Sequence, residues 1–330
     1  MFLEFDDGWT PEVAGSGFAH GGIAWSSDGR ILTSDPDGGR LLVLDPKGRL
    51  LRTIRTTAAE AHGLTLTTLN GRPSVWIADP GFRVVVDGAE AKADRHEWGR
   101  VFAIDLETGS TVVELDPPHH PLYTDLLYRP TFVVVGEAEQ ASSDIWVADG
   151  YGASLVHRYS ADGRYRESLD GETGAGRFDC PHGLHVDRRR SEPYLYVSDR
   201  GNRRIQVFDL DGRFCRAFGQ GELTSPSGFA ALGDRLVVAE LEARLVVLDE
   251  DDRVEAVIGE NEAAVRRPGW PNRIGRDGVL ERPDPFIPAR LNSPHAVVAD
   301  TSGSVYVTEY VLGGRLSRFR PVDPQATRAE

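Results

Sequence analysis

One short pattern recurs six times along the 330 residues of this chain. Each copy is an apolar segment that ends in Asp or Glu and is followed by a turn and a further apolar segment. Repeats of roughly 40 to 50 residues that contain several short strands are typical of β-propeller blades. The six copies end at Asp35, Asp79, Asp149, Asp199, Glu240 and Glu309.

The turns between the apolar segments indicate antiparallel strands. Asp-Gly pairs such as Asp162-Gly163 and Asp211-Gly212 are hairpin signals, and no segment shows a convincing helical period. The sequence therefore predicts an all-β, six-bladed β-propeller as a single domain over residues 1–330, with four antiparallel strands per blade around a central channel. A strand over Phe2–Phe5 is predicted to complete the last blade, which removes an exposed sheet edge.

Three insertions interrupt the repeats, at 82–99, 115–128 and 259–293. The last contains five prolines, at positions 268, 271, 283, 285 and 288, and is predicted to be extended and turn-rich rather than helical. Long loops in a compact domain are often lids or binding loops. Simple surface decoration is the alternative.

Composition narrows the classes of partner and chemistry. The formal net charge of −14 argues against binding nucleic acid or an anionic membrane, and the only lysines, Lys47 and Lys92, leave almost no candidates for Schiff-base chemistry. No apolar run approaches the ~20 residues of a membrane-spanning helix, and the N-terminal stretch does not resemble a signal peptide. We therefore expect a soluble, cytoplasmic monomer that acts on a small molecule. Cys180 and Cys215 are expected to be inert or buried free thiols, because they fall in an innermost and an outermost strand of one blade.

Histidines occupy the start of several innermost strands, where residues from different blades meet on one face of the channel. His62, His182 and His295 lie in alternate blades, so their side chains are expected to converge on the axis. Three imidazoles with an open position suit a catalytic Zn²⁺, although imidazole also binds iron, copper and nickel. The alternative is that His-Gly is a turn signature of the repeat, with each histidine bonded to backbone. His20 lies outside this alternation and is predicted to support the ligands from outside the metal's coordination sphere.

Two side chains that follow second strands are expected on the same face. Tyr151 follows Asp149-Gly150, and Arg200 follows Asp199. A tyrosine beside a cation and a metal can lose its proton below its usual pKa and act as a base, and arginine offers a forked donor for a substrate carboxylate. Tyr310, which follows Glu309, is expected to support the site. Packing at the rim of the propeller is the alternative reading for these residues.

These residues carry a family resemblance. The six-fold pattern resembles NHL-repeat propellers, and within them it is similar to the catalytic core of peptidyl-α-hydroxyglycine α-amidating lyase. The resemblance implies that His62, His182 and His295 bind zinc, that Tyr151 is the catalytic base and that Arg200 assists at the substrate. The matching stretches are His62-Gly63-Leu64, Val147-Ala148-Asp149-Gly150-Tyr151, Pro181-His182-Gly183-Leu184, Val197-Ser198-Asp199-Arg200 and Pro294-His295 with Val305-Tyr306-Val307.

The chain also departs from this family. Ala296 stands where the family has a calcium-binding aspartate, which puts a structural calcium in doubt, and the family's disulfide cysteines are absent. Ser34-Asp35-Pro36 stands where the family has an arginine in its first blade, so substrate anchoring is expected to differ.

The leading hypothesis from the sequence is a zinc-dependent lyase. It would cleave the C–N bond of a small α-hydroxyglycine-like carbinolamine to an amide and a glyoxylate-type product. One alternative keeps the metal site and changes the reaction to hydrolysis, hydration or isomerisation. Another is a noncatalytic NHL propeller that binds a protein or ligand.

Overall fold

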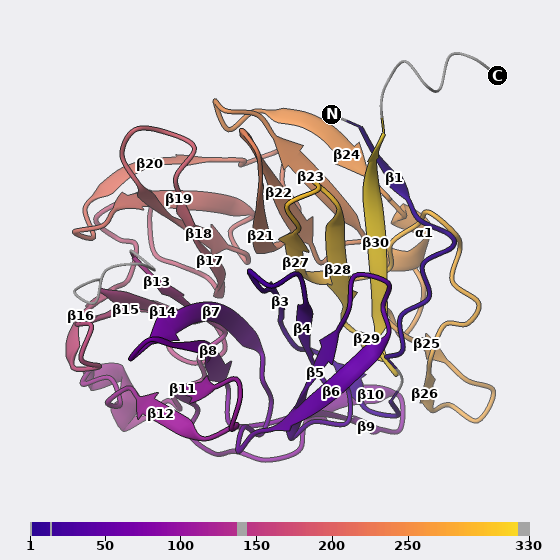
Figure 1. The fold of residues 1–330 in the computed structure, drawn as a ribbon, viewed down its shortest axis with the longest axis horizontal. Coiled ribbons are helices and arrows are strands. Elements are labelled where there is room, and N and C mark those ends of the chain that lie inside the picture. Colours follow the sequence, from indigo (N-terminus) through magenta and orange to yellow (C-terminus); the bar gives the residue numbers. More distant parts are fainter. Residues whose placement is uncertain (1, 14, 137–143, 323–330) are drawn as a thin grey trace.

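Six four-stranded antiparallel sheets surround a central axis in the computed structural model, which describes residues 2–13, 15–136 and 144–322 (Figure 1). This confirms the predicted all-β, six-bladed propeller. Blade one comprises β3 (Ile23–Trp25), β4 (Ile31–Ser34), β5 (Arg40–Leu44) and β6 (Leu50–Arg55). Blade two comprises β7 (Gly63–Leu69), β8 (Arg72–Asp79), β11 (Arg100–Asp105) and β12 (Thr111–Glu114). Blade three comprises β13 (Phe132–Val135), β14 (Ile145–Asp149), β15 (Leu155–Tyr159) and β16 (Tyr165–Leu169).

The remaining blades continue the same order from the axis outward. Blade four comprises β17 (Pro181–Asp187), β18 (Tyr194–Asp199), β19 (Arg204–Asp209) and β20 (Phe214–Phe218). Blade five comprises β21 (Pro226–Leu232), β22 (Arg235–Glu240), β23 (Arg244–Leu248) and β24 (Val254–Ile258). Blade six comprises β27 (Pro294–Ala299), β28 (Val305–Glu309), β30 (Arg315–Val322) and β1 (Phe2–Phe5). The N-terminal strand β1 pairs antiparallel with β30 and completes the sixth blade, as predicted.

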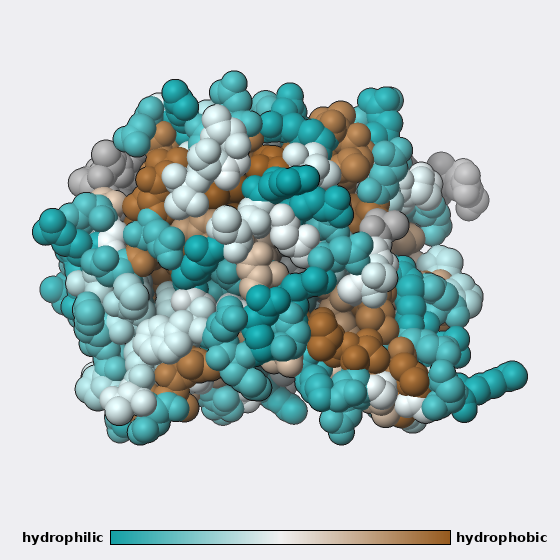
Figure 2. All heavy atoms as spheres, turned by 90° about the horizontal axis from the view of Figure 1, so that it is seen from below, coloured by the Kyte–Doolittle hydropathy of each residue, from teal (hydrophilic) through white to brown (hydrophobic). Residues whose placement is uncertain are grey.

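The core lies between neighbouring blades, and this explains why the second strands are apolar throughout. In β8, Val75 and Ile77 pack against blade one, whereas Trp76 and Ala78 pack against blade three. Because both faces of the strand are buried, alternation of apolar and polar residues is lost. The face of the molecule in Figure 2 is mainly hydrophilic, with apolar side chains in separate patches.

The acid that ends each second strand is buried, and in blades two to six it accepts hydrogen bonds from backbone N–H groups of the loop before the innermost strand. In blade four, Asp199 accepts hydrogen bonds from the backbone N–H of Asp179 at 2.8 Å and from Nε of Arg204 at 2.7 Å. In blade five, Glu240 bonds the backbone N–H of Thr224 and the guanidinium of Arg244, both at 2.5 Å. Desolvating a carboxylate is costly unless hydrogen bonds and a counter-charge replace water, and here both are present.

Blade three replaces the arginine with residues from an insertion. Leu155 occupies the arginine position opposite Asp149. The 3₁₀ turn η1 (Pro121–Thr124), within the insertion at 115–128, brings the Tyr123 hydroxyl to Asp149 at 2.6 Å and to Nε2 of His157 at 2.7 Å. This insertion is therefore part of the blade's polar interior.

The other two insertions meet above the channel. The insertion at 82–99 forms the hairpin β9 (Val84–Asp87) and β10 (Glu90–Ala93), and the one at 259–293 contains β25 (Arg273–Ile274) and β26 (Leu280–Glu281). The backbone N–H of Leu280 donates to the carbonyl of Gly88 in the turn of the first hairpin. The Pro-rich insertion is extended and turn-rich as predicted, except for one helical turn, α1 (Glu262–Val265). The short strands β2 (Phe18–Ala19) and β29 (Val311–Leu312) pair beside these insertions.

Both cysteines are free thiols, but their environments differ. Cys180 is partly buried before the innermost strand of blade four, whereas Cys215 lies in the outermost strand β20 and is exposed. Of the two expected states, buried or inert, burial does not hold for Cys215, because the edge strand β20 leaves its thiol exposed. Within the described residues, no helix has the length and apolar character needed to cross a membrane.

We predict that Asp199→Ala destabilises the fold strongly. The substitution leaves Arg204 and the backbone N–H of Asp179 without their buried acceptor, so the free energy of unfolding should fall by about 3 kcal/mol or more. Urea denaturation followed by tryptophan fluorescence measures this change. The matched control is Asp211→Ala in the same blade, whose exposed pair with Arg213 should contribute no more than about 0.5 kcal/mol. Equal losses in the two variants would contradict the role of the buried acid.

We also predict that His157 contributes to the loss of stability in acid. Burial lowers the pKa of this imidazole to about 3, whereas an unfolded histidine titrates near ~6.5. Between these values only the unfolded state takes up the proton, so the free energy of unfolding decreases as the pH falls. From pH 7 to pH 5 the wild type should lose about 2 kcal/mol more than His157→Gln. Parallel pH profiles of unfolding for the two proteins would contradict this.

Candidate metal centre

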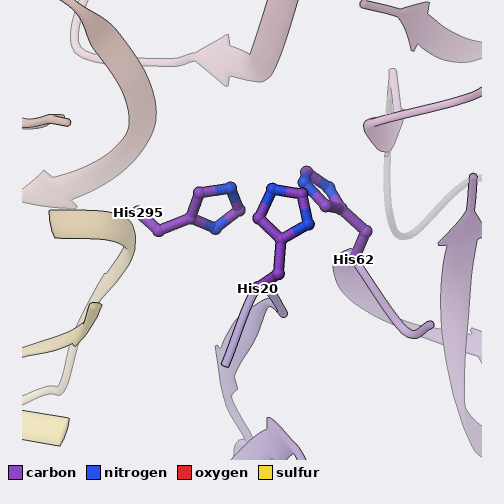
Figure 3. A group of neighbouring side chains, drawn as sticks. All are labelled: His20, His62 and His295. Carbon is purple, nitrogen blue, oxygen red and sulfur yellow. The ribbon is translucent and has the colours of Figure 1, made fainter. Parts of the chain in front are cut away.

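Four buried histidines from four blades meet on the axis of the propeller. His62 directly precedes the innermost strand β7, and His20 lies shortly before β3. His182 lies within β17, and His295 lies within β27. Their exposed fractions are only 1% for His62, 2% for His182 and His295, and 7% for His20. Figure 3 shows the rings of His20, His62 and His295 pointing toward one another.

The His-Gly motif positions two of these rings through the neighbouring blade. Nδ1 of His62 lies 2.6 Å from the carbonyl oxygen of Thr131, and Nδ1 of His182 lies 2.8 Å from that of Ser227. A Cβ on Gly63 would stand 2.6 Å from the Thr131 oxygen, and one on Gly183 would stand 2.3 Å from the Ser227 oxygen. Glycine is therefore required after the histidine so that the carbonyl of the next blade can approach the ring.

These carbonyl contacts fix the tautomer of both rings. A carbonyl oxygen only accepts hydrogen bonds, so Nδ1 of His62 and of His182 must carry the proton and Nε2 must carry a lone pair. The hydroxyl of Tyr151 lies 3.3 Å from Nε2 of His62 and 3.0 Å from Nε2 of His182. A single hydroxyl proton can satisfy only one of these two lone pairs.

His295 adds further unsatisfied nitrogen atoms. Neither of its ring nitrogens has a hydrogen-bond partner among the described residues, although the side chain is buried. Buried polar atoms normally have partners, and several lone pairs around one point are satisfied by a cation. The residues present therefore fit a metal ion.

Two overlapping sets of histidines define this centre. Ligand nitrogens of His20, His62 and His295 all lie within 4.8 Å of one another. The ring of His182 lies 5.0 Å from that of His62 and 4.9 Å from that of His295, measured between centroids. The group of ligand nitrogens within 4.8 Å of one another therefore contains His20 in place of His182 of the predicted trio, and the ring of His182 lies beside this group.

Burial keeps the four imidazoles neutral. It lowers the pKa of His20 to about 3 and holds the pKa values of His62, His182 and His295 well below their usual range, and the positive charge of Arg200 acts in the same direction. Neutral imidazole is the form that binds a metal.

Tyr151 and Arg200 lie beside the histidines on the same face. The guanidinium carbon of Arg200 is 5.5 Å from the centroid of the Tyr151 ring, and its Nη2 donates to Sγ of Cys180 at 3.1 Å. No carboxylate in the described parts of the chain forms an ion pair with Arg200, which leaves it available to an anionic ligand. Burial raises the pKa of Tyr151 above its usual value, and Arg200 opposes this shift.

A cavity of about 310 Å³ opens onto these groups. Tyr151, Arg200, His20 and His295 line its inner end, and the hairpin β9–β10 covers it. The insertion at 82–99 therefore lines the cavity beside the histidines. Tyr310 also lines the cavity, and its ring centroid lies 4.6 Å from that of His20. The other lining residues are Phe82, Val84, Ala91, Lys92, Ala93 and Leu241.

Sequence reasoning missed two residues at this centre. Glu60 lies 2.7 Å from Nδ1 of His20, and Cys180 contacts Arg200. The signal for Glu60 was its place two residues before His62, in the loop that the acid Asp79 holds through backbone N–H groups. Cys180 directly precedes Pro181-His182, which places it near Arg200 on the same face.

The sequence is similar to NHL repeat-containing protein 3 of two mammals. It is 29% identical to the Homo sapiens protein over 61% of this chain and 55% of that protein, and 28% identical to the Mus musculus protein over 63% and 58%. The chain therefore spans little more than half the length of these relatives. No protein-family model matches the sequence.

The fold is also found among solved structures. A streptogramin B lyase structure superposes with a TM-score of 0.58 over 97% of both chains, at 15% sequence identity. At this identity the similarity concerns the fold alone. The chain is therefore a six-bladed β-propeller whose sequence is similar to NHL repeat-containing proteins.

Proposed function

We propose that this chain is a metal-dependent lyase that cleaves the C–N bond of a small α-hydroxyglycine-like substrate. The observation that carries the proposal is that Nε2 of His62 and Nε2 of His182 both face the single proton of the Tyr151 hydroxyl. Among the described residues, the ring nitrogens of His295 have no hydrogen-bond partner and the adjacent Arg200 has no carboxylate partner. His62, His182 and His295 would hold zinc, which suits nitrogen ligands with an open position. The family resemblance of these residues supports the same assignment.

The chain's own groups account for the remaining chemistry. A zinc ion at such a site acts as a Lewis acid that lowers the pKa of a bound hydroxyl. Arg200 binds the substrate carboxylate through its forked donors and orients the carbinol carbon toward Tyr151. As the phenolate, which the positive charge of Arg200 favours, Tyr151 would take the hydroxyl proton while the C–N bond breaks and would then pass this proton to the leaving amide nitrogen. The products are an amide and a glyoxylate-type aldehyde acid, so no oxidant or reductant is needed.

The cavity and its charges favour a small molecule as the substrate. Its volume of about 310 Å³ is at the lower end of ligand pockets, which span roughly 300 to 1,000 Å³. We expect the protein to act in the cytoplasm as a monomer, without nucleic-acid or membrane partners.

A second candidate is a different metal-dependent reaction at the same site. The observation that favours it is Ser34-Asp35-Pro36 in blade one, where the resemblance would require an arginine. Because only Arg200 would hold the substrate carboxylate, the substrate would be anchored differently from that of the lyase family. The competing reactions at the metal site are hydrolysis, hydration and isomerisation. A noncatalytic propeller that binds a ligand or protein is the remaining alternative, and it predicts no stoichiometric metal.

We predict that purified wild-type protein holds one metal ion per chain and that His182→Ala loses it. Removal of this imidazole deletes a ligand and leaves the Ser227 carbonyl without its donor. Elemental analysis after dialysis against a chelator measures the metal content, and His96→Gln, which changes an exposed histidine, is the control. Full metal occupancy in His182→Ala would contradict the assignment. Wild-type protein without metal would favour the noncatalytic propeller.

We predict that Tyr151→Phe keeps the metal but loses activity. The variant lacks the hydroxyl that accepts the substrate proton, so kcat should fall by roughly 10²- to 10⁴-fold. The assay measures glyoxylate and amide released from an N-acyl-α-hydroxyglycine. A wild-type rate in the variant would contradict the role of Tyr151. Turnover of related substrates without glyoxylate would favour the second candidate reaction.

A further inference from the structure

We propose that His20 is a fourth ligand of the metal and that Glu60 holds it in place. This inference rests on the proposed metal site and extends it to residues outside the resemblance. It concerns blade one, where the chain departs from the related lyases.

The first argument is the direction of the His20 ring. Nε2 of His20 lies 2.9 Å from the Tyr151 hydroxyl, which is also within 3.3 Å of Nε2 of His62 and of His182. Three imidazole nitrogens therefore surround one oxygen atom at hydrogen-bond distance. The hydroxyl occupies a point that all three nitrogens face.

The second argument is independent of Tyr151. Ligand nitrogens of His20, His62 and His295 form a group in which all distances are within 4.8 Å (Figure 3). The centroid of the His20 ring is 4.6 Å from that of His62 and 4.8 Å from that of His295. His20 and His62 belong both to this group and to the three histidines around the Tyr151 hydroxyl. His20 therefore makes the same contacts at the centre as His62, which is an expected ligand.

The third argument is the partner of the other ring nitrogen. Nδ1 of His20 lies 2.7 Å from Oε1 of Glu60, and both side chains are more than nine-tenths buried. Metal-bound histidines commonly donate the second ring N–H to a carboxylate or carbonyl, which fixes the ring and increases its basicity. His62 and His182 use carbonyls for this purpose. For His20, Oε1 of Glu60 lies at contact distance without forming a hydrogen bond, and neither atom has another partner among the described residues, so a ring turned by a bound metal would donate to Glu60.

Glu60 is itself fixed by the repeat. Its backbone N–H donates to Asp79 at 3.2 Å, and Asp79 also accepts from the backbone N–H of Ala59 at 2.8 Å. The acid of blade two thus sets the loop from which Glu60 reaches back to blade one.

Four imidazoles constrain the metal and its open positions. A tetrahedral zinc ion with four histidines has no position left, so substrate must enter as a fifth ligand, an expansion that zinc allows. Iron, cobalt and nickel accept five or six ligands more readily. The centre in this chain is therefore expected to bind substrate by increasing its coordination number.

The test compares metal affinity in His20→Ala, Glu60→Gln and wild type. Zn²⁺ is titrated against a competing chelator, and the full chain loaded with Co²⁺ is examined by visible absorption, which reports coordination number without any assay of activity. His20→Ala should bind Zn²⁺ at least about 10-fold more weakly and Glu60→Gln about 10- to 100-fold more weakly. The Co²⁺ bands should shift in His20→Ala because water replaces an imidazole nitrogen as a ligand. His96→Gln should match wild type.

The outcomes separate this inference from the proposed function. If wild type binds metal, His62→Ala loses it and His20→Ala keeps wild-type affinity and Co²⁺ bands, only the fourth ligand is overturned. If wild type binds no metal, both proposals fail. If His20→Ala is unfolded, Glu60→Gln, which keeps the size of the side chain, decides the question: unchanged Zn²⁺ affinity in that variant overturns the inference.

Discussion

The buried carboxylate at the end of each second strand is the interaction on which the rest of this propeller depends. In blades two to six its oxygens accept hydrogen bonds from backbone N–H groups of the loop that leads into the innermost strand, and in most blades it also pairs with a guanidinium from the third strand. That loop is the one that delivers the channel residues. The acid therefore connects the outer packing of a blade with the side chains that the blade presents at the axis.

The chemistry of the channel depends on contacts between blades rather than within them. His62 and His182 donate to carbonyls of the next blade, so the orientation of each ring is set by its neighbour. Thr131, which has no imidazole, continues this pattern through its hydroxyl, which donates to the carbonyl of His182 at 2.8 Å. The arrangement exposes imidazole lone pairs to a single point while all other polar atoms of the two histidine rings are satisfied.

Much of this arrangement follows from the sequence, because a propeller repeats one local geometry. The six acids predicted the blades, and Phe2–Phe5 predicted the closing strand. Repeat position also placed Tyr151 and Arg200 on the face that carries the histidines. These predictions required only that equivalent positions in different blades lie at the same height along the channel.

The residues that the sequence could not place are those that break the repeat. His20 is followed by two glycines, so its position relative to β3 differs from that of His62 relative to β7, and its distance from the axis depends on packing between blades. Glu60 acts across a blade boundary on a residue 40 positions earlier, and no periodic pattern encodes that contact. Tyr123 reaches Asp149 from an insertion whose path is set by tertiary packing.

The origin of the four histidines in four different blades has a thermodynamic consequence. A ligand that binds all four nitrogens in the folded ring and not in the unfolded chain adds its binding free energy to that of folding. Such a ligand cross-links sheets that are distant along the chain and otherwise touch only their immediate neighbours. The same ion would then both activate the substrate and stabilise the fold. The melting temperature of the protein would rise with the concentration of the free ion.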